Sequence, residues 1–145
     1  MSNVNYIPDG FHTVTPYFIV ADGPAFLTFL KAGLGADEIA VYQDAGGRIM
    51  HAQLRLGDSM LEFGEATEQY PQMKLSLHVY VPDTDALYER AVAAGAKTVR
   101  TPRVEPYGER SAGVEDPAGN VWWIATRVGQ LADERLAGCT EEQGA

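Results

Sequence analysis

The segment GVEDPAGNVWWIA, residues 113–125, contains a turn between two apolar runs. Asp116 and Gly119 are residue types that favour tight turns. The apolar runs on either side have the length and the residue types of β-strands. The segment therefore predicts a hairpin with strands at residues 111–115 and 121–126.

A similar hairpin is predicted in the first half of the chain, at residues 50–56 and 59–63. Its strands are separated by Gly57 and Asp58, a pair that favours a turn. Side chains alternate along the first strand, which indicates one apolar face and one polar face. The apolar face is predicted to consist of Met50, Ala52, Leu54 and Leu56, and the polar face of His51, Gln53 and Arg55.

The two halves of the chain repeat one pattern at an offset of 61 residues. Each half begins with a strand, at residues 12–20 and 75–81, and continues with an aspartate and an amphipathic helix. The offset aligns Asp22 with Asp83, Thr15 with Ser76, and Glu62 with Trp123. A register that is kept over about fifty residues indicates an internal duplication.

Each aspartate precedes the signals of a short helix. The side chain of Asp22 is expected to accept hydrogen bonds from the N–H groups of a first helical turn, and either Asp83 or Thr84 is expected to start the second helix. Gly35 and Gly95 favour the left-handed conformation at which helices end. The apolar stripes are Phe26, Leu27, Leu30 and Leu34 in the first helix, and Leu87, Tyr88, Ala91 and Val92 in the second. Each helix is therefore expected to cover one face of a sheet.

These patterns predict an α+β fold of two tandem βαβββ modules. The strands are expected to form a curled mixed β-sheet around a cavity, with the helices on the outer face. The predicted organisation is an N-terminal arm at residues 1–10, a first module at 11–66, a second module at 74–127 and a C-terminal tail at 128–145. A short helix is expected in the tail, at residues 130–136.

Charge and composition argue against several kinds of partner. The 145 residues have a formal net charge of −9. Such a surface repels phosphate backbones and anionic membranes, so neither nucleic acid nor a membrane is expected as a partner. No apolar run has the ~20 residues that cross a bilayer, and the N-terminus lacks the pattern of a secretion signal. The single cysteine, Cys139, excludes an internal disulfide and favours a cytoplasmic location.

The duplicated plan, the segment MHAQLRLGD at residues 50–58 and the hairpin segment quoted first resemble the vicinal-oxygen-chelate superfamily. This superfamily includes glyoxalases, extradiol dioxygenases and bleomycin- and fosfomycin-resistance proteins. The segment YGERS, residues 107–111, is similar to the branch described as PhnB-like, which tends to have a histidine where this chain has Asn120. The resemblance implies the fold and a homodimer. It does not imply a single activity, because the fold hosts several chemistries.

Metal-dependent members of the superfamily hold their ligands on the first and last strand of each module. The matching positions in this chain are Thr15, Glu62, Ser76 and Trp123. Only Glu62 is a strong ligand, whereas a protein-bound divalent ion needs at least three N, O or S donors. The resemblance therefore implies the scaffold without its usual metal, and no cofactor is expected. A displaced divalent-metal site of His51, His78 and Glu62 is the alternative.

Alternation along the strands predicts which side chains line the cavity. The predicted walls are Tyr17, Tyr80 and Trp123, with Glu62, His78, His51 and Gln53 as polar groups and Thr15 and Ser76 on the same faces. Tyr107 and Arg110 are predicted on a loop that contacts the ligand. A mostly apolar pocket with few polar groups is typical of a small-molecule site. Each polar residue also has a purely structural interpretation, as a surface group, a hydrogen-bonded residue or part of an ordinary turn.

Three functions are compatible with these residues. The leading hypothesis is a metal-independent protein of the resistance type, which binds a small apolar or aromatic molecule in the cavity. The second is a lyase or isomerase in which Glu62, helped by His78, removes a proton next to a carbonyl group, or in which the displaced site binds a metal ion. The third is a dimeric remnant whose pocket is closed by its own aromatic side chains.

Overall fold

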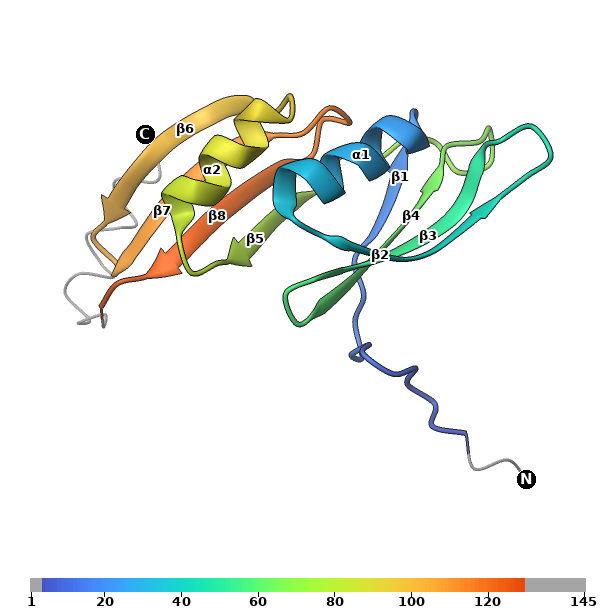
Figure 1. Cartoon of the computed structure of the whole chain (residues 1–145), viewed down its shortest axis with the longest axis horizontal. Coiled ribbons are helices and arrows are strands. Elements are labelled where there is room, and N and C mark those ends of the chain that lie inside the picture. The colour runs from blue at the N-terminus through green and yellow to red at the C-terminus, as the bar shows by residue number, and fades with distance from the viewer. Residues whose placement is uncertain (1–3, 130–145) are drawn as a thin grey trace. The chain divides into compact units, whose positions relative to one another are not determined.

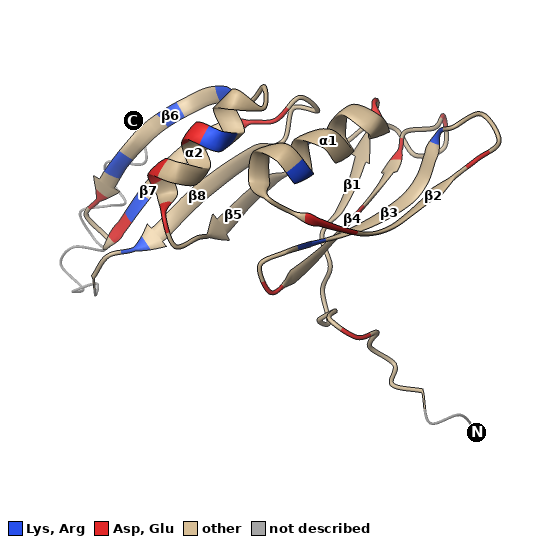
Figure 2. Ribbon diagram, in the orientation of Figure 1, with Lys and Arg blue, Asp and Glu red and all other residues tan. Residues whose placement is uncertain are grey.

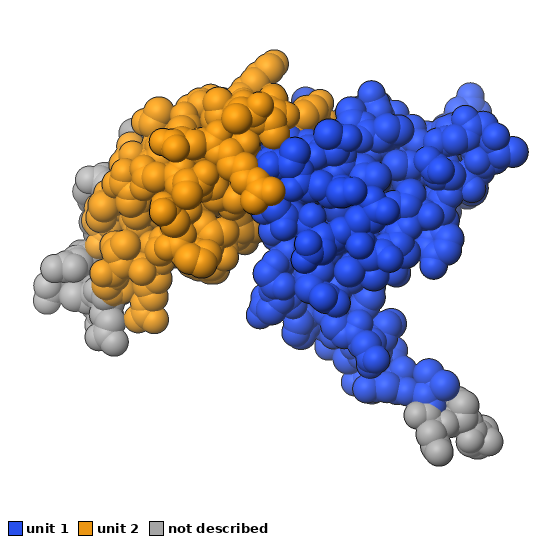
Figure 3. Space-filling view, in the orientation of Figure 1, with its two compact units in different colours: residues 1–75 blue, residues 76–145 orange. Residues whose placement is uncertain are grey.

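The computed structural model describes residues 4–129, so Cys139 and the helix predicted at residues 130–136 lie outside the described residues. The chain divides into two compact units, Met1–Leu75 and Ser76–Ala145 (Figure 3). In each unit one helix covers one face of a four-stranded sheet (Figure 1). The predicted α+β class and tandem βαβββ plan are confirmed. The strands form one four-stranded sheet in each unit, and neither sheet is closed.

Unit 1 consists of β1 (Tyr17–Val20), α1 (Gly23–Leu34), β2 (Asp37–Gln43), β3 (Ile49–Leu56) and β4 (Ser59–Glu65). Its strand order is β1-β4-β3-β2, in which β1 and β4 are parallel and the other neighbours are antiparallel. The helix α1 begins as predicted, because the Asp22 side chain accepts a hydrogen bond of 3.0 Å from the N–H of Ala25. It ends at Gly35, whose φ of 75° is the left-handed conformation that glycine adopts easily.

An aromatic cluster joins α1 to the sheet of unit 1. Phe26 of α1 lies against Phe18 of β1 and Phe63 of β4, with ring centroids 5.1 and 5.0 Å apart. Because side chains alternate along a strand, this packing turns the neighbouring residues to the opposite side of the sheet. We call that side the helix-distal face of unit 1, and its residues are Tyr17, Ile19, His51, Gln53, Glu62 and Gly64.

Unit 2 consists of β5 (Ser76–Tyr80), α2 (Thr84–Ala93), β6 (Lys97–Glu105), β7 (Glu109–Glu115) and β8 (Val121–Arg127), in the strand order β5-β8-β7-β6. The cap of α2 is Asp83 and not Thr84, since the Asp83 side chain accepts a hydrogen bond of 3.1 Å from the N–H of Ala86. Gly95 follows the helix with a φ of 110°. No helix within residues 4–129 is long and apolar enough to span a membrane.

The predicted hairpin of unit 2 is present, and Asp116 organises its turn. One carboxylate oxygen, Oδ1, accepts hydrogen bonds from the N–H groups of Ala118 and Asn120 at 2.8 and 3.0 Å. The other oxygen, Oδ2, accepts a hydrogen bond of 2.8 Å from the indole N–H of Trp122. Trp122 is fully buried, so the adjacent Trp123 projects from the other side of the sheet. We call this side the helix-distal face of unit 2, and its residues include Ser76, His78, Tyr80, Glu109, Ser111, Gly113, Trp123 and Ala125.

Strand pairing supports the internal duplication. Tyr17 of β1 pairs with Glu62 of β4, and His78 of β5 pairs with Trp123 of β8. Both pairs are parallel, and each residue of the second pair lies 61 positions after its counterpart in the first. The offset found in the sequence therefore corresponds to equivalent positions in the two sheets.

The predicted apolar face of residues 50–56 is wrong at its first residue. Met50 is 65% exposed, whereas Ile49 is 1% exposed. Tyr42 pairs with His51 and Gln43 pairs with Ile49, so Met50 has no partner on β2. This irregularity is a β-bulge, which shifts the alternation by one residue and turns Met50 outward.

Two further expectations are also wrong, one about where the first strand begins and one about which face of the second helix is buried. The first strand begins at Tyr17 and not at residue 12, because Pro16 has no N–H group with which to extend the ladder. The carbonyl of Pro16 nevertheless accepts a hydrogen bond of 3.0 Å from the N–H of Glu62. In α2, Val92 is exposed because the helix buries Thr84 and Ala91.

Candidate functional site

The helix-distal face of unit 1 brings four of the predicted site residues together. Nε2 of His51 lies 2.7 Å from Oε2 of Glu62, and the side-chain amide of Gln53 donates a hydrogen bond of 3.2 Å to the same oxygen. The ring of Tyr17 lies beside His51, with centroids 5.8 Å apart. The Glu62 side chain is 20% exposed, so its carboxylate is held by protein groups in place of much of its water shell.

Tyr17 is the aromatic member of this group. Burial raises the pKa of its phenol above the ordinary value of 10.0, and the negative charge of Glu62 raises it further. Both effects favour the neutral form. Tyr17 therefore presents an uncharged aromatic surface at neutral pH. Thr15 lies just before β1 and is partly buried.

A cleft of about 920 Å³ adjoins this face, where β4 leads into residues 66–70. Its apolar lining consists of Tyr17, Ile19, Ile49, Met50 and Tyr70, and its charged lining of Asp44, Arg48, Glu65 and Glu68. Among the expected site residues only Tyr17 contributes to this lining, since His51, Gln53 and Glu62 lie farther along the face. The bulge at Met50 was not predicted, and it places an apolar side chain at the cleft.

Gly64 lines the cleft and lies close to two of its neighbours. A Cβ atom at this position would lie 2.7 Å from the carbonyl oxygen of Met50 and 2.9 Å from the hydroxyl oxygen of Tyr17. Those distances are too short for a carbon atom beside oxygen, so only glycine fits without displacing its neighbours. A glycine within a strand is a common sign of such a close approach.

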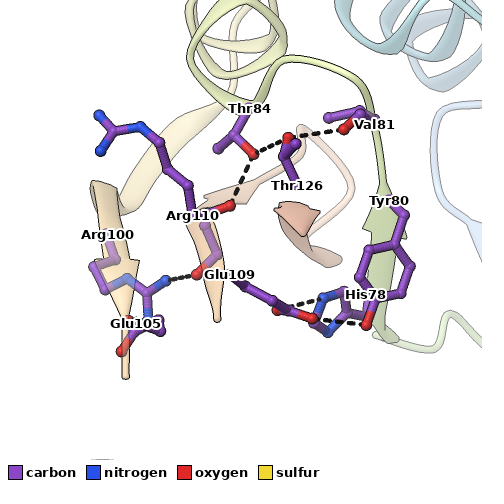
Figure 4. A network of polar contacts seen from close by, with 10 residues as sticks. His78, Tyr80, Val81, Thr84, Arg100, Glu105, Glu109, Arg110 and Thr126 are labelled. Carbon is purple, nitrogen blue, oxygen red and sulfur yellow. Dashed lines mark hydrogen bonds and ion pairs between the residues drawn. The ribbon is translucent and has the colours of Figure 1, made fainter. Parts of the chain in front are cut away.

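Unit 2 has its own polar group on the helix-distal face. Oε1 of Glu109 accepts a hydrogen bond of 2.8 Å from the Tyr80 hydroxyl, and Oε2 lies 3.4 Å from Nε2 of His78 (Figure 4). The rings of His78 and Tyr80 are stacked, with centroids 4.8 Å apart. The hydrogen bond to Glu109 raises the pKa of Tyr80, and burial raises it further. Ser76 begins the same strand and is exposed.

Trp123 lies on the same face, beneath an arginine. The guanidinium carbon of Arg100 is 5.1 Å from the centroid of the indole. The indole covers Gly113, where an added Cβ would lie only 2.5 Å from ring atom Cζ3. Nη1 of Arg100 and Nε of Arg103 contact the same oxygen of Glu105, at 2.9 and 2.6 Å.

Glu109, Arg100 and Glu105 were not predicted as members of a site. Figure 2 shows basic positions along β6 beside the charged positions of β7. Because β7 alternates, Glu109 lies on the same face as Ser111 and Gly113. That parity was available from the sequence. The prediction of a loop at Tyr107 and Arg110 left Glu109 outside the predicted strand.

The structure corrects the prediction for Arg110. This residue lies in β7 and not on a loop, and its guanidinium binds Asp85 of α2 through two hydrogen bonds of 2.5 and 2.9 Å. The pair lowers the pKa of Asp85 and raises the pKa of Arg110. Arg110 therefore faces the helix and not the helix-distal face. Tyr107 lies in the turn before β7, where burial and then the charge of Glu105 raise its pKa.

The residues at the superfamily's ligand positions do not fit a divalent metal. Oε2 of Glu62 is already bound by His51 and Gln53. The indole of Trp123 has no lone pair for a metal ion, because its nitrogen is a donor only, and the positive guanidinium of Arg100 lies over its ring. Within residues 4–129, no three or more His, Cys, Asp or Glu side chains are grouped so that they can hold a metal ion. Of the displaced set, His51 and Glu62 belong to unit 1 and His78 belongs to unit 2.

Comparison with protein families gives a match over most of the chain. The model of the Glyoxalase/Bleomycin resistance protein/Dioxygenase superfamily matches residues 10–124. An uncharacterized protein of Mycobacterium bovis is 24% identical over 142 residues, which cover 90% of this chain and 93% of that protein. A protein of Mycobacterium tuberculosis, also uncharacterized, has the same identity, and the match covers 84% of its length.

Solved structures share the fold. TioX from Micromonospora sp. ML1 aligns with a TM-score of 0.71 and 24% identity, over 81% of this chain and 99% of TioX. A glyoxalase-related enzyme from Fulvimarina pelagi aligns with a TM-score of 0.64 and 20% identity, over 80% of this chain and 88% of the enzyme. A glyoxalase/bleomycin resistance protein from Streptomyces sp. CB03234 has a TM-score of 0.61 and 26% identity, over 76% of this chain and 96% of that protein.

Proposed function

This chain belongs to the glyoxalase/bleomycin resistance protein/dioxygenase superfamily, and on that premise we propose that it binds a small apolar or aromatic molecule without the aid of a metal. The binding site is the cleft of unit 1. The observation that carries the proposal is the combination of this cleft with Tyr17, an uncharged aromatic residue on its wall.

The size and lining of the cleft support this proposal. Its volume of about 920 Å³ falls within the range of small-molecule pockets, which is about 300–1,000 Å³. Tyr17 and Tyr70 offer aromatic surface, and Ile19 and Met50 offer aliphatic surface. A planar apolar ligand gains free energy from each surface that it removes from water. The flexible Met50 side chain also adapts to ligands of different outline.

The donor chemistry supports metal independence. Glu62 is engaged by His51 and Gln53, and the other superfamily positions present two hydroxyl groups and an indole. The cleft supplies shape and apolar contact, which require no Lewis acid. Binding is therefore expected to survive complete removal of divalent ions.

Calorimetric titration of chelator-treated protein tests the proposal. Planar two- and three-ring aromatic compounds are compared with aliphatic compounds of similar size. We expect saturable binding of aromatic compounds, weakened several-fold in Met50→Ala, because the side chain contributes apolar contact. The matched control is Met73→Ala, since Met73 is also exposed but does not line the cleft. Absence of saturable binding, or equal loss in both variants, contradicts the proposal.

The contact between His51 and Glu62 favours a second candidate function, that of a lyase or isomerase. Glu62 would act as a base that removes a proton next to a carbonyl group, with His51 at 2.7 Å in the supporting role first assigned to His78. The test is deuterium exchange into α-hydroxy ketones in deuterium oxide. A catalysed exchange that Glu62→Gln abolishes at unchanged stability supports this candidate, and exchange at the uncatalysed rate excludes it for these substrates.

A further inference from the structure

Two buried carboxylates lie on the helix-distal face of unit 2, and they differ in how their charge is compensated. Glu105 is 3% exposed and is contacted by both Arg100 and Arg103. Glu109 is 9% exposed, and within residues 4–129 no arginine or lysine forms an ion pair with it. A buried carboxylate needs a cation or several hydrogen bonds to offset the loss of its water shell. Glu109 therefore lacks the arginine partners that Glu105 has among the described residues.

The acceptor without a hydrogen bond is one atom, Oε2 of Glu109. Its companion, Oε1, accepts a hydrogen bond of 2.8 Å from Tyr80, whereas Oε2 is buried and accepts none among the described residues. The nearest basic group is the imidazole of His78, at 3.4 Å. Buried polar atoms without a hydrogen bond are rare in folded proteins, and they often mark the place of a ligand or ion.

Two exposed aromatic rings lie beside the buried Oε2 atom. Glu109 reaches from β7 across β8 to β5, which the small side chain of Ala125 allows. There it contacts the stacked rings of His78 and Tyr80. The His78 side chain is 43% exposed and Tyr80 is 68% exposed. A carboxylate beside exposed aromatic faces is the combination that binds organic cations, through charge and cation–π attraction.

Arg100 shows the same chemistry within the protein itself. Its guanidinium lies over the indole of Trp123 and contacts the carboxylate of Glu105. A ligand cation at Glu109 would likewise contact a carboxylate while lying beside aromatic rings, those of His78 and Tyr80. The cationic group of such a ligand must donate a hydrogen bond, as the N–H of an amidinium or ammonium group does, because the unsatisfied atom is a hydrogen-bond acceptor.

We propose that Glu109, His78 and Tyr80 form a second ligand site, which binds an amidinium or ammonium group attached to an aromatic ring. The Oε2 atom of Glu109 accepts the N–H hydrogen bond. The rings of His78 and Tyr80 contact the aromatic part of the ligand, and rotation of the exposed imidazole opens the way to Oε2. This site consists of residues of unit 2 alone, so its existence does not depend on the function proposed above.

Benzamidine and benzamide test this site because they have nearly the same shape and differ in charge. Both are titrated into the full-length protein while the ring signals of His78 and Tyr80 are followed by NMR. Benzamidine is expected to shift both signals and to bind about tenfold more tightly than benzamide, the ratio typical of a hydrogen bond to a charged group. Equal binding of the two compounds, or no shift with either, overturns the proposal.

Variants identify the residues responsible. Glu109→Gln keeps the shape of the side chain and is expected to abolish the preference for benzamidine. Glu115→Gln is the matched control on the same strand, and it is expected to keep the preference. Tyr80→Ala alters an exposed side chain, so the fold is retained and benzamidine binding weakens several-fold. A preference that persists in Glu109→Gln, or binding that is unchanged in Tyr80→Ala, overturns the assignment.

Discussion

Nε2 of His51 and Oε2 of Glu62 lie 2.7 Å apart, although the two residues come from neighbouring antiparallel strands and are not directly paired. The ladder pairs Glu62 with Gln53, so the imidazole reaches the carboxylate diagonally across the face. Both neighbours bind the same oxygen. His51 and Gln53 therefore fix the position of the Glu62 carboxylate, which lies on a strand whose other face packs into the core.

A double-mutant cycle measures how strongly this pair is coupled. His51→Ala, Glu62→Gln and the double variant are unfolded in urea at low salt. The expected coupling is about 0.5–1 kcal/mol, at the upper end for surface ion pairs, because Glu62 is more buried than a typical surface carboxylate. The exposed pair of Lys31 and Glu38 serves as the control and should show a smaller coupling. Equal coupling in the two pairs would contradict the described geometry.

The raised pKa of Tyr17 predicts a pH dependence of stability in the alkaline range. The folded protein favours the neutral phenol, so this contribution to stability is fully present below pH 10.0 and is lost as the pH rises through the raised pKa. Glu62→Gln removes the second cause of the shift, and the Tyr17 pKa should fall while remaining above 10.0 through burial. Difference absorbance against Tyr17→Phe isolates the titration. Identical curves for the wild type and Glu62→Gln would refute this explanation.

Asp116 is expected to contribute more to stability than any exposed turn residue. Asp116→Ala leaves the indole N–H of Trp122 buried without an acceptor and removes the hydrogen bonds of the turn, at a cost of about 3 kcal/mol. The control is Asp58→Ala in the corresponding turn of unit 1, where the exposed side chain should contribute less than about 0.5 kcal/mol. Chemical denaturation compares the two. Similar losses in both variants would show that the Asp116 network is not specific.

The strong local signals explain why the fold was predictable. Asp22 and Asp83 act as helix caps, and the turn at Asp116 closes a hairpin, as the residue types indicated. The errors occurred where a tertiary feature overrides a local pattern. A bulge at Met50 reverses the alternation of β3, and it depends on the register of β2, which no residue near Met50 specifies.

The candidate site was predictable only in part. Parity placed Tyr17, His51, Gln53 and Glu62 on one face, and the structure brings them together. The partner of His78 was missed because Glu109 lies 31 positions away in sequence and reaches it across an intervening strand. Alternation identifies the face of a side chain, but it does not identify how far a long side chain extends over that face.

Gly113 is predicted to be irreplaceable because the indole of Trp123 lies on it. In Gly113→Ala the new methyl group would overlap the ring at 2.5 Å, so the indole must move. Overpacking of this kind costs about 1–3 kcal/mol, and the tryptophan emission should shift as the ring gains exposure. Gly129→Ala is the control, since nothing lies within 4 Å of the added atom. Unchanged emission and stability in Gly113→Ala would contradict this contact.

NMR of tyrosine ring signals, recorded during titration with 2-naphthol, tests the proposed binding cleft most directly. Tyrosine-to-phenylalanine variants assign the signals. The account predicts saturable shifts of the ring signals of Tyr17 and Tyr70, which line the cleft. The ring signals of Tyr6, which is 90% exposed and lies in the N-terminal arm, should stay unchanged. Removal of divalent ions should leave the titration unaltered. Saturable binding that leaves Tyr17 and Tyr70 unshifted, or no saturable shift of either, would contradict the account.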